Sequence, residues 1–167
     1  MPKGIFAVLA KKLLPLVVSF LSLNSYASDV PPELVGTWKL TSWTVQAVGE
    51  DSREPFGPNA KGRIVITKDG YWTAVLTGAN RRPAKTVDEK AALLDTLLAY
   101  SGKYSVVDDQ ITILVDMSSN EIYTGTNQRQ TRFFKIEGNK LSIRTAEMAS
   151  AALPGKRVVV TLACERE

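Results

Sequence analysis

The sequence predicts an all-β domain: an eight-stranded antiparallel up-and-down barrel with one helix inserted between the third and fourth strands. Eight runs of strand-forming residues follow one another, with turn-forming residues between them. One stretch alone changes to helical spacing. Eight antiparallel strands in sequence order favour a barrel, which closes its own edges and has room for one small ligand. The strand pattern by itself also fits a β-sandwich.

The first 27 residues have the three parts of a cleavable signal peptide. Three lysines precede an apolar run over residues 13–23, and residues 25–27 place small side chains at positions −3 and −1 of a cleavage site. A membrane anchor is the alternative, but a span needs about 20 apolar residues. We therefore expect cleavage after Ala27 and an exported protein, periplasmic or secreted, that is soluble after cleavage. A short extended lead-in is expected over residues 28–33, and one barrel domain over residues 34–167.

The mature chain is expected to be almost neutral. The sequence has 21 basic and 17 acidic residues, and three of the basic ones, Lys3, Lys11 and Lys12, lie in the predicted signal peptide, which has no acid. The remainder has 18 basic against 17 acidic residues, a net charge of +1. Such a chain has no general attraction to nucleic acid or to anionic lipid. We expect no nucleic-acid partner and no membrane span in the mature protein, and no pattern indicates an oligomeric state.

The chain has no histidine and a single cysteine, Cys164. Catalysis of the Ser-His-Asp and Cys-His kinds is therefore excluded, and a zinc site is disfavoured because His and Cys are its preferred ligands. No disulfide can form within the chain, so stability has to come from the hydrophobic core. We expect Cys164 to be a small buried residue of the last strand, and we expect no metal and no cofactor.

Turn signals separate the expected strands. Asp69-Gly70 predicts a tight hairpin between the second and third strands, and a Glu-Gly-Asn turn at residues 137–139 joins the sixth to the seventh. In chain order, the strands are expected at residues 38–48, 63–67, 71–77, 103–107, 110–117, 128–136, 140–145 and 156–165.

The single helix is expected over residues 87–98. Val87, Ala91, Leu94 and Leu98 recur at helical spacing, and Thr86 begins a capping box three residues before a glutamate. The apolar stripe of this helix is expected to pack against or under the barrel.

The motif Gly36-Thr37-Trp38 resembles the Gly-x-Trp opening of lipocalins. More specifically, the chain resembles the lipocalin-like domain family of bacteria and fungi, through six blocks that occur in the family order. They span nearly all of residues 34–166, at residues 36–40, 54–59 with 61–63, 69–71, 99–104, 130–134 and 165–166. The resemblance implies a lipocalin-like barrel, and it says little about function because barrel folds serve many functions.

The resemblance also implies structural roles for Gly36, Trp38 and Arg166 at the closed end of the barrel, with the arginine lying against the tryptophan as a cation–π pair. One departure from the family concerns the strand at residues 111–115. Relatives often carry histidines there, whereas this chain has apolar side chains. Family chemistry that used those imidazoles does not carry over, and the interior is expected to be more apolar.

Candidate pocket residues follow from strand alternation and from the aromatic residues. If Arg166 points inward, alternation along the last strand also turns Val158, Val160, Leu162 and Cys164 inward. In the sixth strand Gln130 and Arg132 share a face with Phe134, and the family block favours an inward orientation of that face. Aromatic rings either line a cavity or simply fill the barrel. The candidate pocket residues are Tyr71, Trp72, Tyr104, Gln130, Arg132 and Phe134, with Tyr100 as a further aromatic candidate.

An inward Arg132 needs a partner, because an unpaired buried charge is costly. Three arrangements are open: a salt bridge to a protein carboxylate such as Asp116 or Glu121, a bond to the anionic group of a ligand, or exposure at the surface. The loop at residues 55–59, with Phe56 at its centre, is either a lid over one end of the barrel or a rigid surface turn.

No residue is assigned a catalytic role, and the leading functional hypothesis is non-catalytic binding of a small hydrophobic or amphipathic molecule in the barrel. An isomerase, cyclase or hydrolase using Tyr, Arg or carboxylate groups is one alternative. It requires at least two of Tyr71, Tyr104, Arg132 and Asp116 within hydrogen-bond reach of one another. A filled barrel that acts as a structural or interaction protein is the other alternative, which an apolar patch around residues 87–98 would favour.

Overall fold

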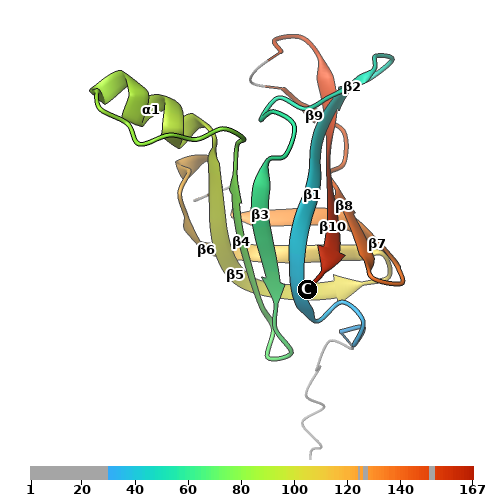
Figure 1. Cartoon of the computed structure of the whole chain (residues 1–167). Coiled ribbons are helices and arrows are strands. Elements are labelled where there is room, and N and C mark those ends of the chain that lie inside the picture. The colour runs from blue at the N-terminus through green and yellow to red at the C-terminus, as the bar shows by residue number, and fades with distance from the viewer. Residues whose placement is uncertain (1–29, 124, 126–127, 151–152) are drawn as a thin grey trace, which may run out of the picture.

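Strands dominate the computed structural model of the chain, which describes residues 30–123, 125, 128–150 and 153–167 (Figure 1). The predicted signal peptide over residues 1–27 lies outside the described residues. Within them, no helix is both long enough and apolar enough to span a membrane.

Eight long strands close into an antiparallel barrel. Each pairs with the next one along the chain, and β1 also pairs with β10, which joins the two ends of the sheet. The eight strands are β1 (Gly36–Ala47), β3 (Lys61–Ile66), β4 (Tyr71–Thr77), β5 (Leu97–Val107), β6 (Gln110–Ser118), β7 (Arg129–Glu137), β8 (Lys140–Arg144) and β10 (Arg157–Arg166). Two-residue strands β2 (Ser52–Arg53) and β9 (Met148–Ala149) add to β1 and β10. The predicted eight-stranded up-and-down barrel is confirmed, and closure excludes the sandwich.

One end of the barrel is sealed by Trp38 and Arg166, which lie opposite each other in the β1–β10 ladder. The Arg166 guanidinium carbon lies 4.2 Å from the centre of the Trp38 ring. The same guanidinium donates from Nη1 to the Val35 carbonyl at 2.8 Å and from Nη2 to the Glu33 carbonyl. The Trp38 indole N–H donates to the Leu34 carbonyl at 2.9 Å. We call this part of the molecule the closed end.

The lead-in to β1 departs from the extended segment predicted at residues 28–33. The described part of it turns, with the Leu34 N–H donating to the Pro31 carbonyl at 2.8 Å. The turn lies next to the backbone carbonyls of residues 33–35, which accept the hydrogen bonds from Arg166 and Trp38. Gly36 follows with φ +148°, and a β-carbon there would collide with Nη1 of Arg166.

A β-bulge changes the facing of β1 halfway along. The register shifts between Leu40 and Ser42, so that Trp38 and Leu40 are buried before the bulge and Trp43 and Ala47 after it. Simple alternation from Trp38 would turn Trp43 outward, and the extra residue of the bulge turns it inward instead.

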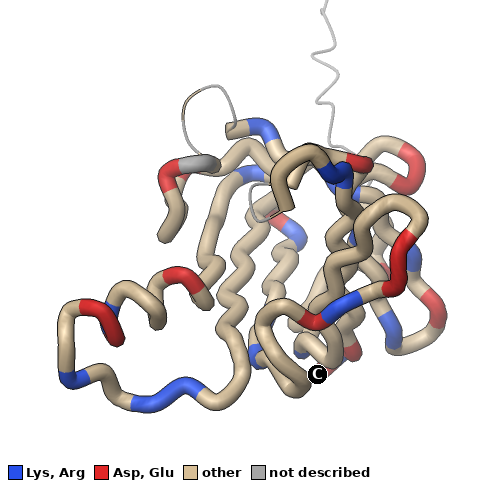
Figure 2. Tube along the Cα trace, turned by 90° about the horizontal axis from the view of Figure 1, so that it is seen from above, with Lys and Arg blue, Asp and Glu red and all other residues tan. Residues whose placement is uncertain are grey.

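The helix prediction is correct at its start and wrong at its end and in its packing. α1 (Val87–Asp95) begins at the Thr86 capping box, but Leu98 belongs to β5, where it pairs with Leu76 of β4. No residue of α1 is buried, and Figures 1 and 2 both show the helix standing away from the barrel. Leu97 and Leu98 pair with β4 as part of β5, so they do not complete the apolar stripe of the helix. Val87 and Leu94 are therefore left exposed.

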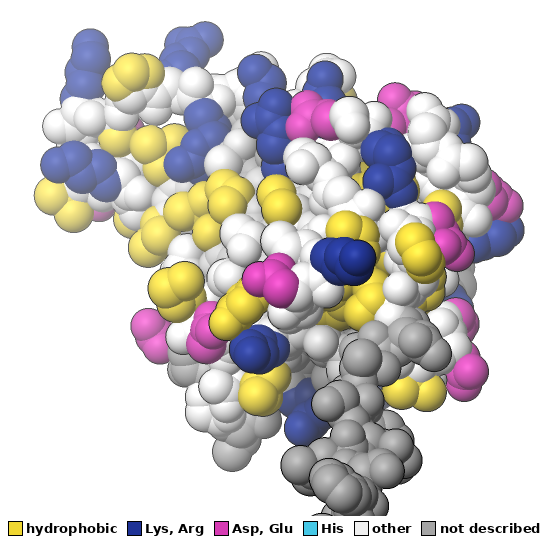
Figure 3. All heavy atoms as spheres, turned by 90° about the horizontal axis from the view of Figure 1, so that it is seen from below, with side chains coloured by type: hydrophobic (Ala, Val, Ile, Leu, Met, Phe, Trp, Pro, Cys, Tyr) yellow, Lys and Arg dark blue, Asp and Glu magenta, His cyan; other side chains and the backbone are white. Residues whose placement is uncertain are grey.

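Charge is spread over the molecule. Figure 2 shows Lys and Arg interspersed with Asp and Glu around the barrel and along the arm that carries α1. On the face seen from below, Figure 3 shows apolar side chains interrupted by basic and acidic ones. The five ion pairs found among the described residues are all at the surface, where such pairs contribute little to stability.

Replacing Trp38 with Ala should lower the free energy of unfolding by about 3–5 kcal/mol, because it removes a fully buried ring and the surface on which Arg166 stacks. Chemical denaturation measures this loss. Tyr71→Ala is the matched control, since the Tyr71 ring is 40% exposed and its loss should cost about 1 kcal/mol or less. Equal effects of the two substitutions would contradict the role of the Trp38–Arg166 pair.

Cys164 should be inert in the folded protein. It is buried in β10, and burial raises the pKa of its thiol to about 12. The thiolate is the reactive form, so a thiol-reactive disulfide reagent at pH 8 should modify the native chain about three orders of magnitude more slowly than the denatured chain. Stopped-flow absorbance in buffer and in denaturant measures the two rates. Comparable rates would show that Cys164 is accessible.

Candidate functional site

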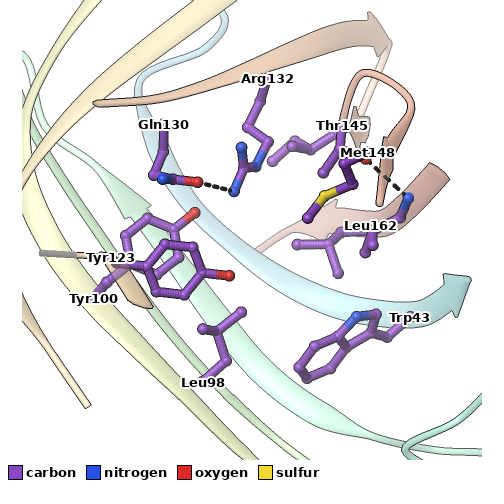
Figure 4. Close-up of a pocket in the computed structure, with 11 residues that line it drawn as sticks. Trp43, Leu98, Tyr100, Tyr123, Gln130, Arg132, Thr145, Met148 and Leu162 are labelled. Carbon is purple, nitrogen blue, oxygen red and sulfur yellow. Dashed lines mark hydrogen bonds between the residues drawn. The ribbon is translucent and has the colours of Figure 1, made fainter. Parts of the chain in front are cut away.

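A pocket of about 270 Å³ lies in the half of the barrel away from the closed end. We call this half the pocket end, and it carries β2, β9 and α1 (Figure 1). Apolar and aromatic side chains dominate the lining, and Figure 4 shows them arranged around the space with a few polar groups among them. The lining residues are Trp43, Leu98, Tyr100, Tyr123, Gln130, Arg132, Ile143, Thr145, Met148, Val160 and Leu162.

A stack of three aromatic rings leads from the core into the pocket. Trp72 is fully buried, its ring centre lies 6.3 Å from that of Tyr100, and the centre of Tyr100 lies 5.5 Å from that of Tyr123. Tyr100 comes from β5, whereas Tyr123 comes from the short 3₁₀ helix η1 (Glu121–Tyr123). Burial raises the pKa of Tyr100, and the positive charge of Arg132 acts in the opposite direction. The Tyr100 phenol therefore stays protonated at neutral pH.

The positive charge of the pocket comes from Arg132, near the start of β7. Its Nη2 donates to Oε1 of Gln130 at 2.9 Å, a bond that Figure 4 shows, and its Nη1 donates to the Thr131 carbonyl at 2.9 Å. These bonds orient the guanidinium without neutralising it.

Neither carboxylate proposed as a partner for Arg132 forms an ion pair with it. Asp116 is exposed on β6, and Glu121 is exposed in η1. Among the described residues, no carboxylate oxygen lies within 4.0 Å of the Arg132 nitrogens. The salt-bridge arrangement is therefore absent from the described part of the chain.

Trp43 forms the wall opposite the polar groups (Figure 4). Its side chain is 5% exposed, and its indole N–H has no hydrogen-bond partner among the described residues. Phe56 stacks on the Trp43 ring with the ring centres 3.8 Å apart. The loop that carries Phe56 is tied down, because the Phe56 carbonyl accepts a bond from the Ala79 N–H at 2.8 Å. The loop thus supports Trp43 from behind.

The predicted pocket residues fall into two groups. Gln130 and Arg132 line the pocket, together with Val160 and Leu162 from the predicted inward face of β10. The others lie elsewhere. Phe134 is half-buried against the core.

The remaining aromatic candidates lie outside the pocket lining. Trp72 lies beneath Tyr100 in the core, and the Tyr104 hydroxyl donates to the Thr67 carbonyl at 2.8 Å. Tyr71 is on the outer face of β4, where Lys103 lies over its ring. Trp72 and Tyr104 therefore fill the barrel interior instead of lining the pocket.

Several lining residues escaped the sequence analysis for identifiable reasons. Trp43 faces inward because of the bulge in β1. Leu98 fits the helical spacing of the preceding residues but belongs to β5, and Tyr123 lies in η1, where no strand alternation exists. Ile143 and Thr145 share a face with the buried Leu141, so alternation along β8 was a usable signal for them.

The groups named for the enzymatic alternative do not meet in the pocket. That alternative needs at least two of four groups close together, but only Arg132 lines the pocket, and no two of the four hydrogen-bond to each other among the described residues. The described part of the chain also has no cluster of three or more Cys, Asp or Glu side chains that could hold a metal ion.

Comparison with known proteins gives similar solved structures and a family match. One similar solved structure is a lipocalin-like protein from Bacteroides uniformis ATCC 8492, with 14% sequence identity and a TM-score of 0.43; the match covers 81% of this chain and 99% of that one. Another is an uncharacterized protein from Bacteroides eggerthii DSM 20697, with 11% identity and a TM-score of 0.43; that match covers 78% of this chain and 98% of the other. No curated protein matches the chain. The model of the lipocalin-like domain matches residues 35–166, which contain every strand of the barrel. The chain therefore belongs to the lipocalin-like domain family.

Proposed function

We propose that the chain is an exported lipocalin-like protein that binds a small hydrophobic or amphipathic molecule, without catalysis, in the pocket lined by Trp43, Tyr100 and Arg132. The observation that carries the proposal is the pocket itself, an unfilled space with mostly apolar walls inside a barrel that has an apolar core. A concave, mainly apolar site with a few polar groups is the usual form of a small-molecule site.

The size of the pocket favours a small ligand. Its volume of about 270 Å³ is just below the usual range for drug-sized molecules, roughly 300–1,000 Å³. At about 30 Å³ for each water-sized atom group, it has room for about nine non-hydrogen atoms. The mostly apolar walls favour an apolar ligand, because moving apolar surface from water into the pocket is favourable.

The two alternatives have weaker support. An isomerase, cyclase or hydrolase needs groups that donate and accept protons around one substrate, and Tyr71 and Tyr104 lie outside the pocket. For a structural or interaction protein, the supporting observation is the exposure of Val87 and Leu94 on α1. A pocket with polar groups in its wall is better explained by a bound molecule.

Export is proposed from the sequence of the first 27 residues, which has the basic start, apolar run and small-residue cleavage site of a signal peptide. The barrel is compatible with an oxidising compartment, because its one cysteine is buried and no disulfide is needed. We place the mature chain in the periplasm or outside the cell.

Filling the pocket should abolish ligand binding. With 1-octanol as a neutral probe and tryptophan fluorescence as the signal, the unsubstituted protein should show saturable binding, and Leu98→Trp should weaken it at least about tenfold because the larger ring occupies the pocket. Leu94→Trp, on the exposed surface of α1, is the matched control and should bind normally. Circular dichroism checks that both variants keep the barrel. Absence of saturable binding of both 1-octanol and octanoate by the unsubstituted protein would refute the proposed function.

Cleavage should follow Ala27. When the full sequence is expressed in a bacterial host, the protein should be recovered outside the cytoplasm. Its intact mass, measured by mass spectrometry, should equal that of residues 28–167. Ala27→Leu should block processing, because the cleavage site needs a small side chain at position −1, whereas Ala7→Leu should be processed normally. Exported protein that retains Met1 in the unsubstituted chain would contradict this assignment.

A further inference from the structure

We infer that the ligand is an amphipathic monocarboxylate, whose carboxylate is bound by Arg132 and whose apolar chain lies against the wall formed by Leu98, Ile143 and Leu162. This inference rests on the proposed function and names the class of molecule that the same pocket takes.

The first step in the argument is the uncompensated charge of Arg132. A guanidinium has five N–H donors. This half-buried side chain donates to Gln130 and Thr131 and also interacts with the Tyr100 hydroxyl, and none of these three groups carries a negative charge at neutral pH. A charge held partly out of water is costly unless an opposite charge pairs with it. No carboxylate of the described residues does so, which leaves the charge available to pair with the anionic group of a ligand.

The second step is the surplus of hydrogen-bond donors in the pocket wall. The Trp43 indole N–H has no partner among the described residues. Thr145 Oγ accepts from the Val160 N–H at 3.0 Å, which leaves its hydroxyl hydrogen to donate. The Tyr100 hydroxyl stays protonated, so it too is a donor. A wall that offers donors and a positive charge is complementary to a ligand group rich in acceptors.

The third step is the size of the charge. The lining holds one arginine and no acidic side chain, so its formal charge is +1. A carboxylate balances this charge and fits the planar fork of the guanidinium. A doubly charged phosphate monoester would leave one negative charge unpaired in a largely apolar site, which is unfavourable.

The fourth step is the apolar remainder of the lining. Leu98, Ile143 and Leu162 come from three different strands and line the same space. Figure 4 shows Leu98 and Leu162 on the side of the pocket away from Gln130. With room for about nine non-hydrogen atoms, the pocket suits a headgroup with a chain of about six to eight carbons. The polar and apolar parts of the lining thus match the two ends of a medium-chain carboxylate.

The test compares octanoate with 1-octanol, two probes that share a chain and differ in the headgroup. At pH 8, the unsubstituted protein should bind octanoate about 10- to 100-fold more tightly than 1-octanol by isothermal titration calorimetry. Arg132→Gln should remove this preference while leaving the affinity for 1-octanol within about twofold, because the apolar wall is unchanged. Arg132→Lys, which keeps the charge and loses the fork, should retain part of the preference.

Arg129→Gln is the matched control, since it removes the same charge from the same strand at an exposed position outside the pocket lining. It should keep the full preference for octanoate. Equal binding of octanoate and 1-octanol, unchanged by Arg132→Gln, would overturn the carboxylate inference and leave the proposed function standing. Failure of the unsubstituted protein to bind either probe would overturn both. Unchanged affinity of Arg132→Gln for 1-octanol shows that this variant is folded.

Discussion

The pairing of β1 with β10 is the constraint on which the barrel depends, because these strands join the two ends of the sheet. Its register sets Trp38 opposite Arg166 and brings the guanidinium over the ring. The turn before β1 completes this arrangement, since its carbonyls accept bonds from both side chains. A buried indole and a charged guanidinium are thus satisfied together, and the end of the barrel that they seal can be packed with apolar residues.

The same strand pair also creates the pocket. Because β1 carries a bulge between Leu40 and Ser42, its inward face shifts by one residue along the strand. Trp38 packs at the closed end, whereas Trp43 forms a wall of the pocket with Phe56 stacked behind it. A bulge re-aims a side chain in this way without interrupting the sheet. One irregularity in the first strand therefore lets the same strand contribute Trp38 to the closed end and Trp43 to the pocket.

Arg132 gives the pocket its chemical character. The family fold supplies a closed barrel, and the fold alone does not select a ligand. In this chain, the half-buried guanidinium is oriented by Gln130 and lies close enough to Tyr100 for its charge to act on the pKa of that phenol. Burial keeps the phenol protonated and makes it a donor. The pocket therefore combines a single positive charge with apolar walls, a combination suited to a small amphipathic anion.

Short-range patterns in the sequence determined the strand order, the turns, the start of the helix and the shared face of Gln130 and Arg132 on β7. These features follow from turn chemistry, capping and alternation along unbroken strands, all of which act within a few residues. The family resemblance, not a local pattern, favoured the inward orientation of that face of β7. Only the tertiary structure decided the rest of the pocket. Trp43 faces inward because of a bulge in the ladder between β1 and β10, and Leu98 lies in a strand because β4 provides a pairing partner. Backbone pairing between distant segments, which no local pattern encodes, determined which side chains meet in the pocket.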